Sequence, residues 1–438
     1  MSEIPYLPQI PLVLASKSPA RLKTLHDAGI RPAIQVSQVD EDEILRDIRA
    51  LPAGQVLALA AAKARDVATH LDSAQIVEAE NSPAPNIPPL VLGCDSMLEI
   101  DGKIWGKPHT PEVARERLRA MSGNSGILHT GHYLVNSASF ASLSAVSHAT
   151  VHIAPMSDAD IDAYVATGEP LHVAGSFTVD GIGGPFIEEV EGDYHGVVGL
   201  SLPLLRTMLE ETGLSITQLW TDHCPARGNL SEKGWAFLDP KRRVPRQLAD
   251  GFLVCACGHQ HWGLSGAGGI CALRKHEGRV QVLLQLRAPW SHSGGTWAIP
   301  GGAVQWNESA FEGAAREFSE ESGIDSSLLR PYHPENTALM GIEETGDITY
   351  IDSGELIEQR PDLYAKTEAT PCVLLDHGDW SYSTFVVSCP DDVEIRPNNE
   401  SSLLQWFDIE GEPPSPLHPS FARTWFHLRE NARHAMSH

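Results

Sequence analysis

The first half of the chain opens with a short apolar run followed by a helical pattern. Residues 12–15 (LVLA) have the pattern of a short buried strand. A helix is predicted over residues 22–28 and stops at Gly29. Ser18 is a suitable N-cap, and Pro19 suits the first helical position. A strand, a tight loop and a helix N-terminus together predict an anion-binding site, although many α/β proteins begin in this way.

A second unit of the same kind follows in the first half. An alanine-rich helix is predicted over residues 56–69, and a buried strand over 90–92 (LVL). Residues 93–96 (GCDS) are expected at the carboxyl end of this strand, where ligands collect in open α/β sheets. Asp101 and Gly102 then predict a two-residue hairpin turn. This alternation favours an α/β domain.

The second half has strand patterns and one amphipathic helix. Ser309 and Glu312 predict a capping box at the start of this helix. Phe311, Ala315 and Phe318 recur at helical spacing and form an apolar stripe. The other predicted elements are strands at 269–273, 280–285, 383–387 and 404–407 and a closing helix at 421–433.

Length and charge limit the organisation and the partners. A chain of 438 residues predicts two domains, here 1–214 and 263–438, joined by a linker at 215–262. The formal net charge of −25 argues against a nucleic-acid partner, because backbone binding depends on Lys and Arg. The sequence shows no apolar run of 18 residues and no signal-peptide pattern at its start, so we expect a cytoplasmic location without a membrane partner.

Three glutamates crowd one side of the amphipathic helix. Glu317, Glu320 and Glu321 are spaced i, i+3 and i+4, so their like charges repel each other. A solvated acidic face is one explanation. A bound Mg²⁺ or Mn²⁺ is another, because hard cations take carboxylate and phosphate oxygens together.

The spacing around these glutamates is more specific than their charge. From Gly302 the chain has five residues, Glu308, seven residues and then REFSEESGI over 316–324. This string resembles the Nudix hydrolase signature at every defined position. The resemblance implies an α/β/α sandwich that cleaves a pyrophosphate linkage in a nucleoside diphosphate joined to another group.

The Nudix resemblance also implies roles for particular residues. Glu317, Glu320 and Glu321 would hold the metal, with Glu320 as the catalytic assignment. Glu308 would contribute through water, and Arg316 would orient a glutamate. Glu400 is a further candidate acid. Residues 331–371 match no part of the family pattern and are expected to form an insertion or a lid.

A series of short motifs in the first half resembles the Maf family of nucleoside triphosphate pyrophosphatases. The motifs are SKSPAR, VDEDE, LALAAAKA, GCDS, GKP, TGEPLHVAG and EGDYHGVVGLSLPLL, in that order over roughly residues 10–214. The resemblance implies a mixed α/β domain of the Maf/ITPase-like type. It also implies metal-dependent cleavage of nucleoside triphosphates to monophosphate and pyrophosphate.

The Maf resemblance assigns the charged residues of the first site. Ser16 and Arg21 fall in its phosphate loop, and Asp95 matches its proton acceptor. Its charged contacts fall on Glu41, Lys63 and Lys107. Arg and Lys would neutralise the triphosphate, and Glu41 and Asp95 can hold the metal. Taken by itself, Lys63 is more readily read as a solvent-facing lysine.

Two positions depart from the Maf pattern. Ala20 replaces the first arginine of SxSPRR, which removes one phosphate contact. Asp180 stands where many members have glutamine, and it is assigned to substrate binding. A turn residue before Gly181 is the alternative reading. The base preference therefore stays open.

The middle of the chain carries a basic run and a Cys/His-rich segment. KRRVPRQ over 241–247 is expected to be a solvated linker. Four residues that can bind metal lie within seven positions: Cys255, Cys257, His259 and His261. Zinc, with Cys224 as an outside ligand, is one alternative, but ligands spaced so closely cannot easily surround one ion. Reduced cysteines are the other alternative and are favoured here.

The sequence thus predicts a bifunctional nucleotide hydrolase that acts in nucleotide-pool sanitation. The alternative is a nucleotide-binding regulatory protein in which one half has lost turnover. The expected partners are nucleotide substrates and a second copy of the chain.

Overall fold

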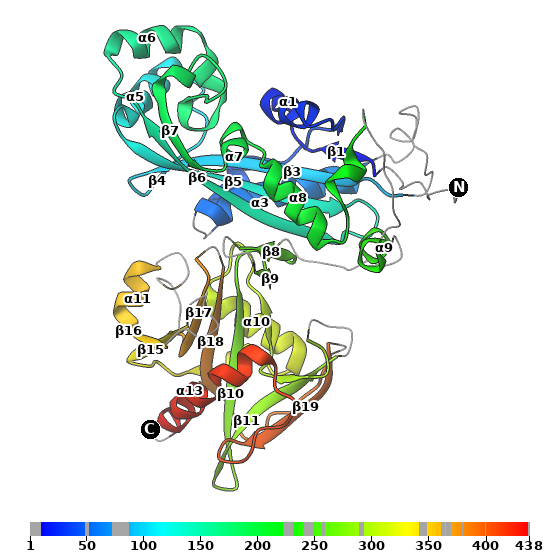
Figure 1. Cartoon of the computed structure of the whole chain (residues 1–438). Coiled ribbons are helices and arrows are strands. Elements are labelled where there is room, and N and C mark those ends of the chain that lie inside the picture. Colours follow the sequence, from blue (N-terminus) through cyan, green and yellow to red (C-terminus); the bar gives the residue numbers. More distant parts are fainter. Residues whose placement is uncertain are drawn as a thin grey trace, which may run out of the picture. The chain divides into compact units, whose positions relative to one another are not determined.

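The computed structural model describes residues 10–48, 52–71, 87–221, 231–239, 249–255, 259–288, 293–340, 348–360, 364, 369–378, 380–398 and 400–436 (Figure 1). The chain folds into two compact units, Met1–Ala256 and Cys257–His438. Each unit is built on its own mixed sheet, which confirms the predicted two-domain α/β class. No described helix is long and apolar enough to cross a membrane.

The N-terminal sheet has the strand order β2-β1-β3-β5-β6-β8, with β4 on β3 and β7 on β6. Neighbours pair in parallel at β1–β2, β1–β3 and β6–β8, and antiparallel elsewhere on this path. The strands are β1 Leu12–Leu14, β2 Ala33–Ile34, β3 Leu90–Ile100, β4 Lys103–Trp105, β5 Ser125–Asn136, β6 Ser142–Ile153, β7 Ile187–Gly192 and β8 Phe252–Val254.

Helices lie against both faces of this sheet. A Cβ at Gly93 would lie 2.1 Å from Ala60 O, and one at Gly131 would lie 2.6 Å from Val56 O, so both glycines allow α3 to approach closely. The helices are α1 Pro19–Asp27, α2 Glu41–Asp47, α3 Pro52–His70, α5 Pro111–Met121, α6 Asp158–Ala166, α7 Tyr194–Val198, α8 Leu202–Glu211 and α9 Glu232–Leu238. Short 3-10 turns are η1 Glu169–His172, η2 Ala174–Ser176, η3 Gly184–Phe186 and η4 Ile216–Leu219.

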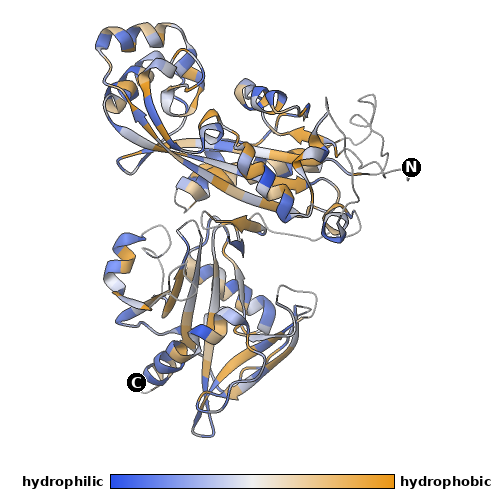
Figure 2. Ribbon diagram, viewed as in Figure 1, coloured by the Kyte–Doolittle hydropathy of each residue, from blue (hydrophilic) through white to orange (hydrophobic). Residues whose placement is uncertain are grey.

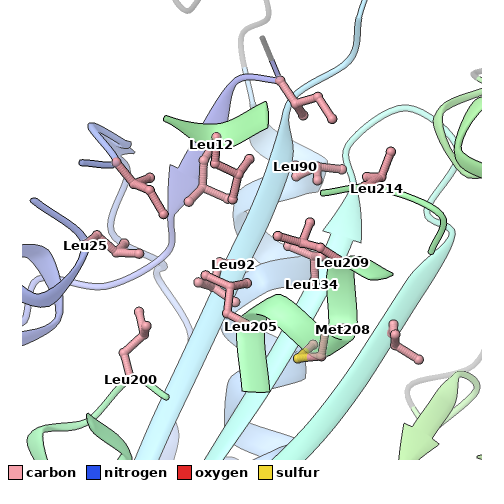
Figure 3. Close-up of a cluster of buried hydrophobic side chains, with 14 of the residues drawn as sticks. Leu12, Leu25, Leu90, Leu92, Leu134, Leu200, Leu205, Met208, Leu209 and Leu214 are labelled. Atoms are coloured by element: carbon pink, nitrogen blue, oxygen red, sulfur yellow. The ribbon is translucent and has the colours of Figure 1, made fainter. Parts of the chain in front are cut away.

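The main core of the N-terminal unit joins β1, β3 and β5 to α1 and α8. Leu12, Leu92 and Leu134 from the strands pack with Leu205 and Met208 of α8 (Figure 3). Burial of this apolar area, at roughly 25 cal/mol per Å², fixes the helices on the sheet. The core therefore sets the position of the loop between β1 and α1, which carries the predicted phosphate site.

The N-terminal elements follow the predictions closely, with one correction. β1, α1 and its N-cap Ser18 are as expected. β3, however, continues from Leu90 to Ile100, so residues 93–96 lie inside a strand and not at its carboxyl end. Continuous pairing with β5 holds this stretch extended despite its turn-like composition. The segment predicted as a linker contributes η4, α9 and β8 to this unit.

The C-terminal sheet has the order β12-β11-β10-β18-β17-β15-β16, with β13 on β10, β14 on β18 and β19 on β11. Its strands are β10 Ala267–His276, β11 Arg279–Arg287, β12 Trp297–Ala298, β13 Gly301–Ala303, β14 Arg330–Pro331, β15 Asn336–Met340, β16 Thr349–Asp352, β17 Val373–Asp376, β18 Ser381–Ser388 and β19 Ser401–Asp408. The short strand β9 Gln260–Trp262 precedes them in the chain and is not part of this sheet. The helices are α10 Ala310–Ser322, α11 Ser353–Gln359 and α13 Pro419–Ala435, with a 3-10 turn η5 Ser326–Leu328.

Alternate residues of the central strands face different helices. Ile270 and Ala272 of β10 pack in one core with Phe318 of α10. Cys271 and Leu273 pack in another core with Leu428 of α13. This period-2 alternation produces the α/β/α layering that the sequence predicted. In Figure 2, hydrophobic colour follows the strands, whereas α13 also carries hydrophilic residues.

Part of the 331–371 segment belongs to the sheet. β15 pairs with β17 in parallel and with β16 antiparallel, so residues of the 331–371 segment extend one side of the C-terminal sheet. Residues 341–347, 361–363 and 365–368 lie outside the described part of the chain. A lid role for this segment stays a prediction.

Candidate active sites

The first site lies where β3 loses a neighbour. Pairing of β1 with β3 ends at Leu92, and pairing of β4 with β3 begins at Leu98. Among the described residues, no strand pairs with residues 93–97 on that side, so Asp95 lies at an opening in the sheet edge. This opening, rather than a strand end, places the GCDS motif where a ligand can reach it.

Arg21 is the buried anchor of this opening. Its guanidinium donates to Gly199 O at 2.8 Å, Cys94 O at 2.7 Å, Ser16 Oγ at 3.2 Å and Ser96 Oγ at 3.1 Å. All four acceptors are neutral, so these bonds fix the side chain and leave its positive charge available to an anion. Ser16 Oγ also accepts from Ser18 N at 3.2 Å, which closes the loop before α1.

Lys63 joins the two carboxylates of the site. Its ammonium lies 2.6 Å from Asp95 Oδ1 and 3.0 Å from Glu41 Oε1. Lys63 is 7% and Asp95 8% exposed, so this lysine is not the solvent-facing residue of the alternative reading. Burial alone would raise the pKa of Glu41. The charge and hydrogen bond of Lys63, together with the charges of Lys107 and Arg21, outweigh this effect, so the pKa lies below its usual range.

Lys107 follows the β4 strand and belongs to the same group. Its burial, together with the charges of Arg21 and Lys63, lowers the pKa of its ammonium. The structure therefore brings six of the predicted residues together: Ser16, Arg21, Glu41, Lys63, Asp95 and Lys107. The cluster combines cations for a polyphosphate with a buried carboxylate that can accept a proton.

Asp180 lies apart from these six residues, in a pocket beside α1. The pocket has a volume of about 230 Å³, and its lining includes Lys23, Asp180, Tyr194 and His195. Sequence reasoning missed the contribution of α1 and α7 to this pocket, although the YHGVV stretch was part of the family pattern. Asp180 therefore belongs to a second part of the site rather than to the phosphate cluster.

The second site is built on α10 and the glycine-rich strand before it. Ser309 caps α10 with the predicted capping box. Arg316 donates to Glu308 Oε1 at 2.7 Å and Oε2 at 3.0 Å, and to Glu317 Oε1 at 2.6 Å. A Cβ at Gly302 would lie 2.4 Å from Glu317 Oε2, so only glycine allows this carboxylate so close to the backbone.

Glu321 lies deep in the second site. It is 4% exposed, and its Oε2 accepts from Gly301 N at 2.7 Å and from Gln285 Nε2 at 3.2 Å. Burial raises the pKa of Glu321 to about 8, and the charges of Glu317 and Glu400 act in the same direction. The negative charges of Glu317 and Glu400 thus make ionisation of Glu321 less favourable, and a bound hard cation would make it more favourable.

Glu320, the third predicted metal ligand of α10, is in a different environment. The Glu320 side chain is 51% exposed and lies 3.5 Å from Arg316 Nη1. Among the three predicted metal ligands of α10, Glu320 is therefore the one that solvent and a substrate can reach most easily. Its neighbours Glu317 and Glu321 are held in place by hydrogen bonds.

Gln285 and Ser401 were missed by sequence reasoning. Both are buried, and Ser401 Oγ donates to Gln285 Oε1 at 2.6 Å, which turns the Gln285 amide group toward Glu321. The sequence signal for Gln285 was a polar residue within the apolar run of β11, because a buried polar group needs a hydrogen-bond partner. These residues hold the Glu321 carboxylate, which is one of the predicted metal ligands.

The histidines of the Cys/His-rich segment pack with residues of the C-terminal sheet. The His261 ring stacks on Trp380 at 4.1 Å and lies 4.3 Å from the His377 ring. Burial and the neighbouring histidines lower the pKa of His261 to about 4. Cys255 is disulfide-bonded, which corrects the expectation of reduced cysteines there. Cys224 and Cys257 lie outside the described residues.

Some known proteins are similar to one of the two units, and one relative is similar to both. The model of "Maf-like protein" matches residues 11–212, and that of "NUDIX domain" matches residues 265–339. A nucleoside triphosphate pyrophosphatase from Salinispora tropica is 51% identical over 48% of this chain and 87% of its own length. A Nudix hydrolase structure from M. smegmatis, RenU, is 29% identical, with a TM-score of 0.32, over 42% of this chain and 96% of its own.

One relative spans both units. The nucleoside triphosphate pyrophosphatase/Nudix hydrolase fusion protein of Bifidobacterium longum is 35% identical, over 95% of this chain and 97% of its own length. Similarity at this level over nearly the full length of both chains covers both sites described above. The chain therefore belongs to the family of fusion proteins that join a Maf-type nucleoside triphosphate pyrophosphatase to a Nudix hydrolase.

Proposed function

We propose that the N-terminal unit hydrolyses nucleoside triphosphates to monophosphate and pyrophosphate at the Arg21–Lys63–Asp95 cluster. The observation that carries this proposal is the buried Lys63, which lies 2.6 Å from Asp95 and 3.0 Å from Glu41 at the sheet opening. Arg21 and Lys107 supply further positive charge beside it. A cluster of this composition suits a polyphosphate and a proton-accepting carboxylate together.

The reaction at this cluster is hydrolysis of the bond between the α-phosphorus and the oxygen that bridges it to the β-phosphate. The oxygen of water forms a bond to the α-phosphorus, and the bond from the α-phosphorus to the bridging oxygen breaks. Asp95 accepts the proton of the attacking water, and pyrophosphate leaves with the bridging oxygen. Arg21 and Lys107 stabilise the charge on the leaving pyrophosphate.

The donor sets of both sites fit a divalent cation, Mg²⁺ or Mn²⁺. In the first site, the Glu41 and Asp95 oxygens already converge on one cation, the Lys63 ammonium. In the second site, Glu317, Glu320 and Glu321 offer carboxylate oxygens. The neighbouring acids raise the pKa of Glu321, so a cation would favour its charged form. A bound divalent ion supplies charge neutralisation of phosphate and a water of lowered pKa.

For the C-terminal unit we propose hydrolysis of a nucleoside diphosphate that is linked to another group. Arg316 holds Glu308 and Glu317 in place, and Gln285 holds Glu321. The accessible Glu320 is assigned the catalytic role. Together the two activities would remove unwanted nucleotides from the cytoplasmic pool.

The test uses the full chain with Asp95→Asn and Glu320→Gln made separately. Pyrophosphate release from nucleoside triphosphates, and monophosphate release from nucleoside diphosphate derivatives, are measured with Mg²⁺ and with Mn²⁺. Asp95→Asn should lower only the first activity and Glu320→Gln only the second, each by about 10²–10⁴-fold. If neither change lowers any activity, both site assignments are wrong. Nucleotide binding without turnover in the wild type would instead favour the regulatory alternative.

A further inference from the structure

The pocket beside α1 has the shape and chemistry for a planar ring rather than for phosphate. Val198 and Leu202 give it apolar walls, and Tyr194 and His195 meet edge to face with ring centroids 5.8 Å apart. Asp180 is the acidic group on its loop side. A carboxylate repels phosphate oxygens but accepts hydrogen bonds from ring N–H groups.

The pocket and the phosphate cluster share two elements, α1 and α7. Thr24, which lines the pocket, lies three residues after Arg21 on α1, so these two side chains are neighbours on the helix surface. At the other wall, Arg21 Nε donates to Gly199 O, and Gly199 ends α7. A nucleotide with its phosphates beside Arg21 can therefore place its base between α1 and α7.

Glu169 fixes the loop that carries Asp180. Its Oε1 accepts from Gly183 N at 3.0 Å and Tyr164 Oη at 3.1 Å, and its Oε2 accepts from Ile182 N at 3.0 Å. Thr178 Oγ1 also donates to this carboxylate. Although burial opposes it, these bonds lower the pKa of Glu169, so the carboxylate stays charged and keeps the loop closed.

We propose that this pocket receives the nucleobase of the triphosphate and that Asp180 selects a guanine-type edge. The inference rests on the triphosphate hydrolysis proposed above. The two oxygens of Asp180 match the adjacent N1–H and N2–H groups of guanine. The Lys23 ammonium pairs with Asp27 at 2.6 Å and has further N–H groups for the O6 carbonyl. Adenine, cytosine and uracil lack two adjacent N–H donors. Glu169 is a positioning residue for Asp180.

The first test compares kcat/KM of the full chain for GTP, ITP, XTP, ATP and UTP. GTP should exceed ITP, which lacks the 2-amino group, by about 10-fold, because a hydrogen bond to a charged group is lost. Asp180→Asn should reverse the order of GTP and XTP, because an amide matches N1–H and the O2 carbonyl of xanthine. An unchanged order in Asp180→Asn would overturn the proposal.

Binding of the same five nucleotides is measured as well, in order to separate base selection from turnover. Kd values for the five nucleotides are determined with Asp95→Asn, alone and combined with Asp180→Asn. A guanine preference that Asp180→Asn removes supports the pocket even where hydrolysis is absent. Hydrolysis of triphosphates with no effect of Asp180→Asn in either assay refutes the pocket and leaves the proposed activity standing.

The second test addresses Glu169. Glu169→Gln should bring the GTP/ITP ratio toward 1 and raise the KM for GTP about 10-fold with a smaller change in kcat. A purely structural role would lower the activity with all five nucleotides equally, and this outcome would remove Glu169 from the proposal. Glu188→Gln, which removes the charge of an exposed residue of β7, is the matched control and should leave the ratio unchanged.

Discussion

The two units place glutamates of the same kind in opposite electrostatic surroundings. In the N-terminal unit, Lys63 lowers the pKa of Glu41 and bonds Asp95 directly. In the C-terminal unit, Glu321 is buried against a backbone amide and a glutamine, and its pKa is raised to about 8. The first site therefore carries a directly bonded counter-charge. The hydrogen bonds to Glu321 come from the neutral Gly301 and Gln285 amides, and the Arg287 charge only partly offsets its burial.

This difference has a chemical consequence for the resting protein. A carboxylate paired with an ammonium is ionised at neutral pH and needs no further charge to stay so. A carboxyl group with a pKa of about 8 is largely protonated at pH 7, and a cation shifts it to the charged form. Stability of the first site should thus depend on its lysine, and stability of the second on pH and metal.

The largest expected effect comes from removing that lysine. Lys63→Met leaves the buried Asp95 carboxylate without its cation, which should lower the free energy of unfolding of the N-terminal unit by about 3–5 kcal/mol. Pyrophosphate release should fall as well. The measurement is urea unfolding followed by hydrogen exchange of α3 and β3.

The double variant Lys63→Met/Asp95→Asn controls this experiment. A neutral amide next to methionine removes the uncompensated charge, so most of the lost stability should return while activity stays low. If the double variant is less stable than Lys63→Met, the two side chains contribute mainly through packing. The proposed electrostatic difference between the two sites would then be wrong.

The second prediction is that the two units respond to pH in opposite directions. Glu41 has a lowered pKa, so its stabilising effect is present above its unfolded pKa and is lost as the pH falls through the folded value. Glu321 has a raised pKa, so without metal its burial costs nothing below about pH 4.3. That cost grows by about 1.4 kcal/mol per pH unit as the pH rises toward 8.

Amide exchange of α2 and α10, corrected for the intrinsic pH dependence of exchange, measures both trends in one sample. Protection of α2 should decrease at acid pH, and protection of α10 should decrease toward pH 8. Mg²⁺ should restore α10 most strongly at high pH. Glu321→Gln should remove the slope in α10, and a slope that persists in this variant would contradict the assignment.

The features that the sequence predicted depend on local spacing. Ser18 and Ser309 cap their helices because an N-cap bonds an amide only a few residues away. The stripe ending at Phe318 packs as expected because helix geometry fixes its direction. The glutamates of α10 were placed correctly on the helix for the same reason, whereas the deep burial of Glu321 depends on the sheet beneath it.

The features that were missed depend on contacts between distant residues. The GCDS motif lies inside β3 because residues 130–133 of β5 supply a continuous partner, which no local pattern shows. Gln285 and Glu321 are 36 residues apart, and Glu169 and Gly183 are 14 apart. Hydrogen bonds of this kind exist only after the backbone has folded, so residue composition cannot reveal them.

The smallest predicted effect concerns the support beneath the second site. Ser401→Ala removes the hydroxyl that holds Gln285, so the Gln285 amide can turn away from Glu321. We expect a loss of about 1 kcal/mol in stability and a few-fold loss in the Nudix activity, with pyrophosphate release unchanged. Ser402→Ala, at an exposed position next to it in β19, is the control. Equal effects of the two substitutions would show that Glu321 is held by the Gly301 amide alone, and the C-terminal site would then depend on fewer buried contacts than the N-terminal one.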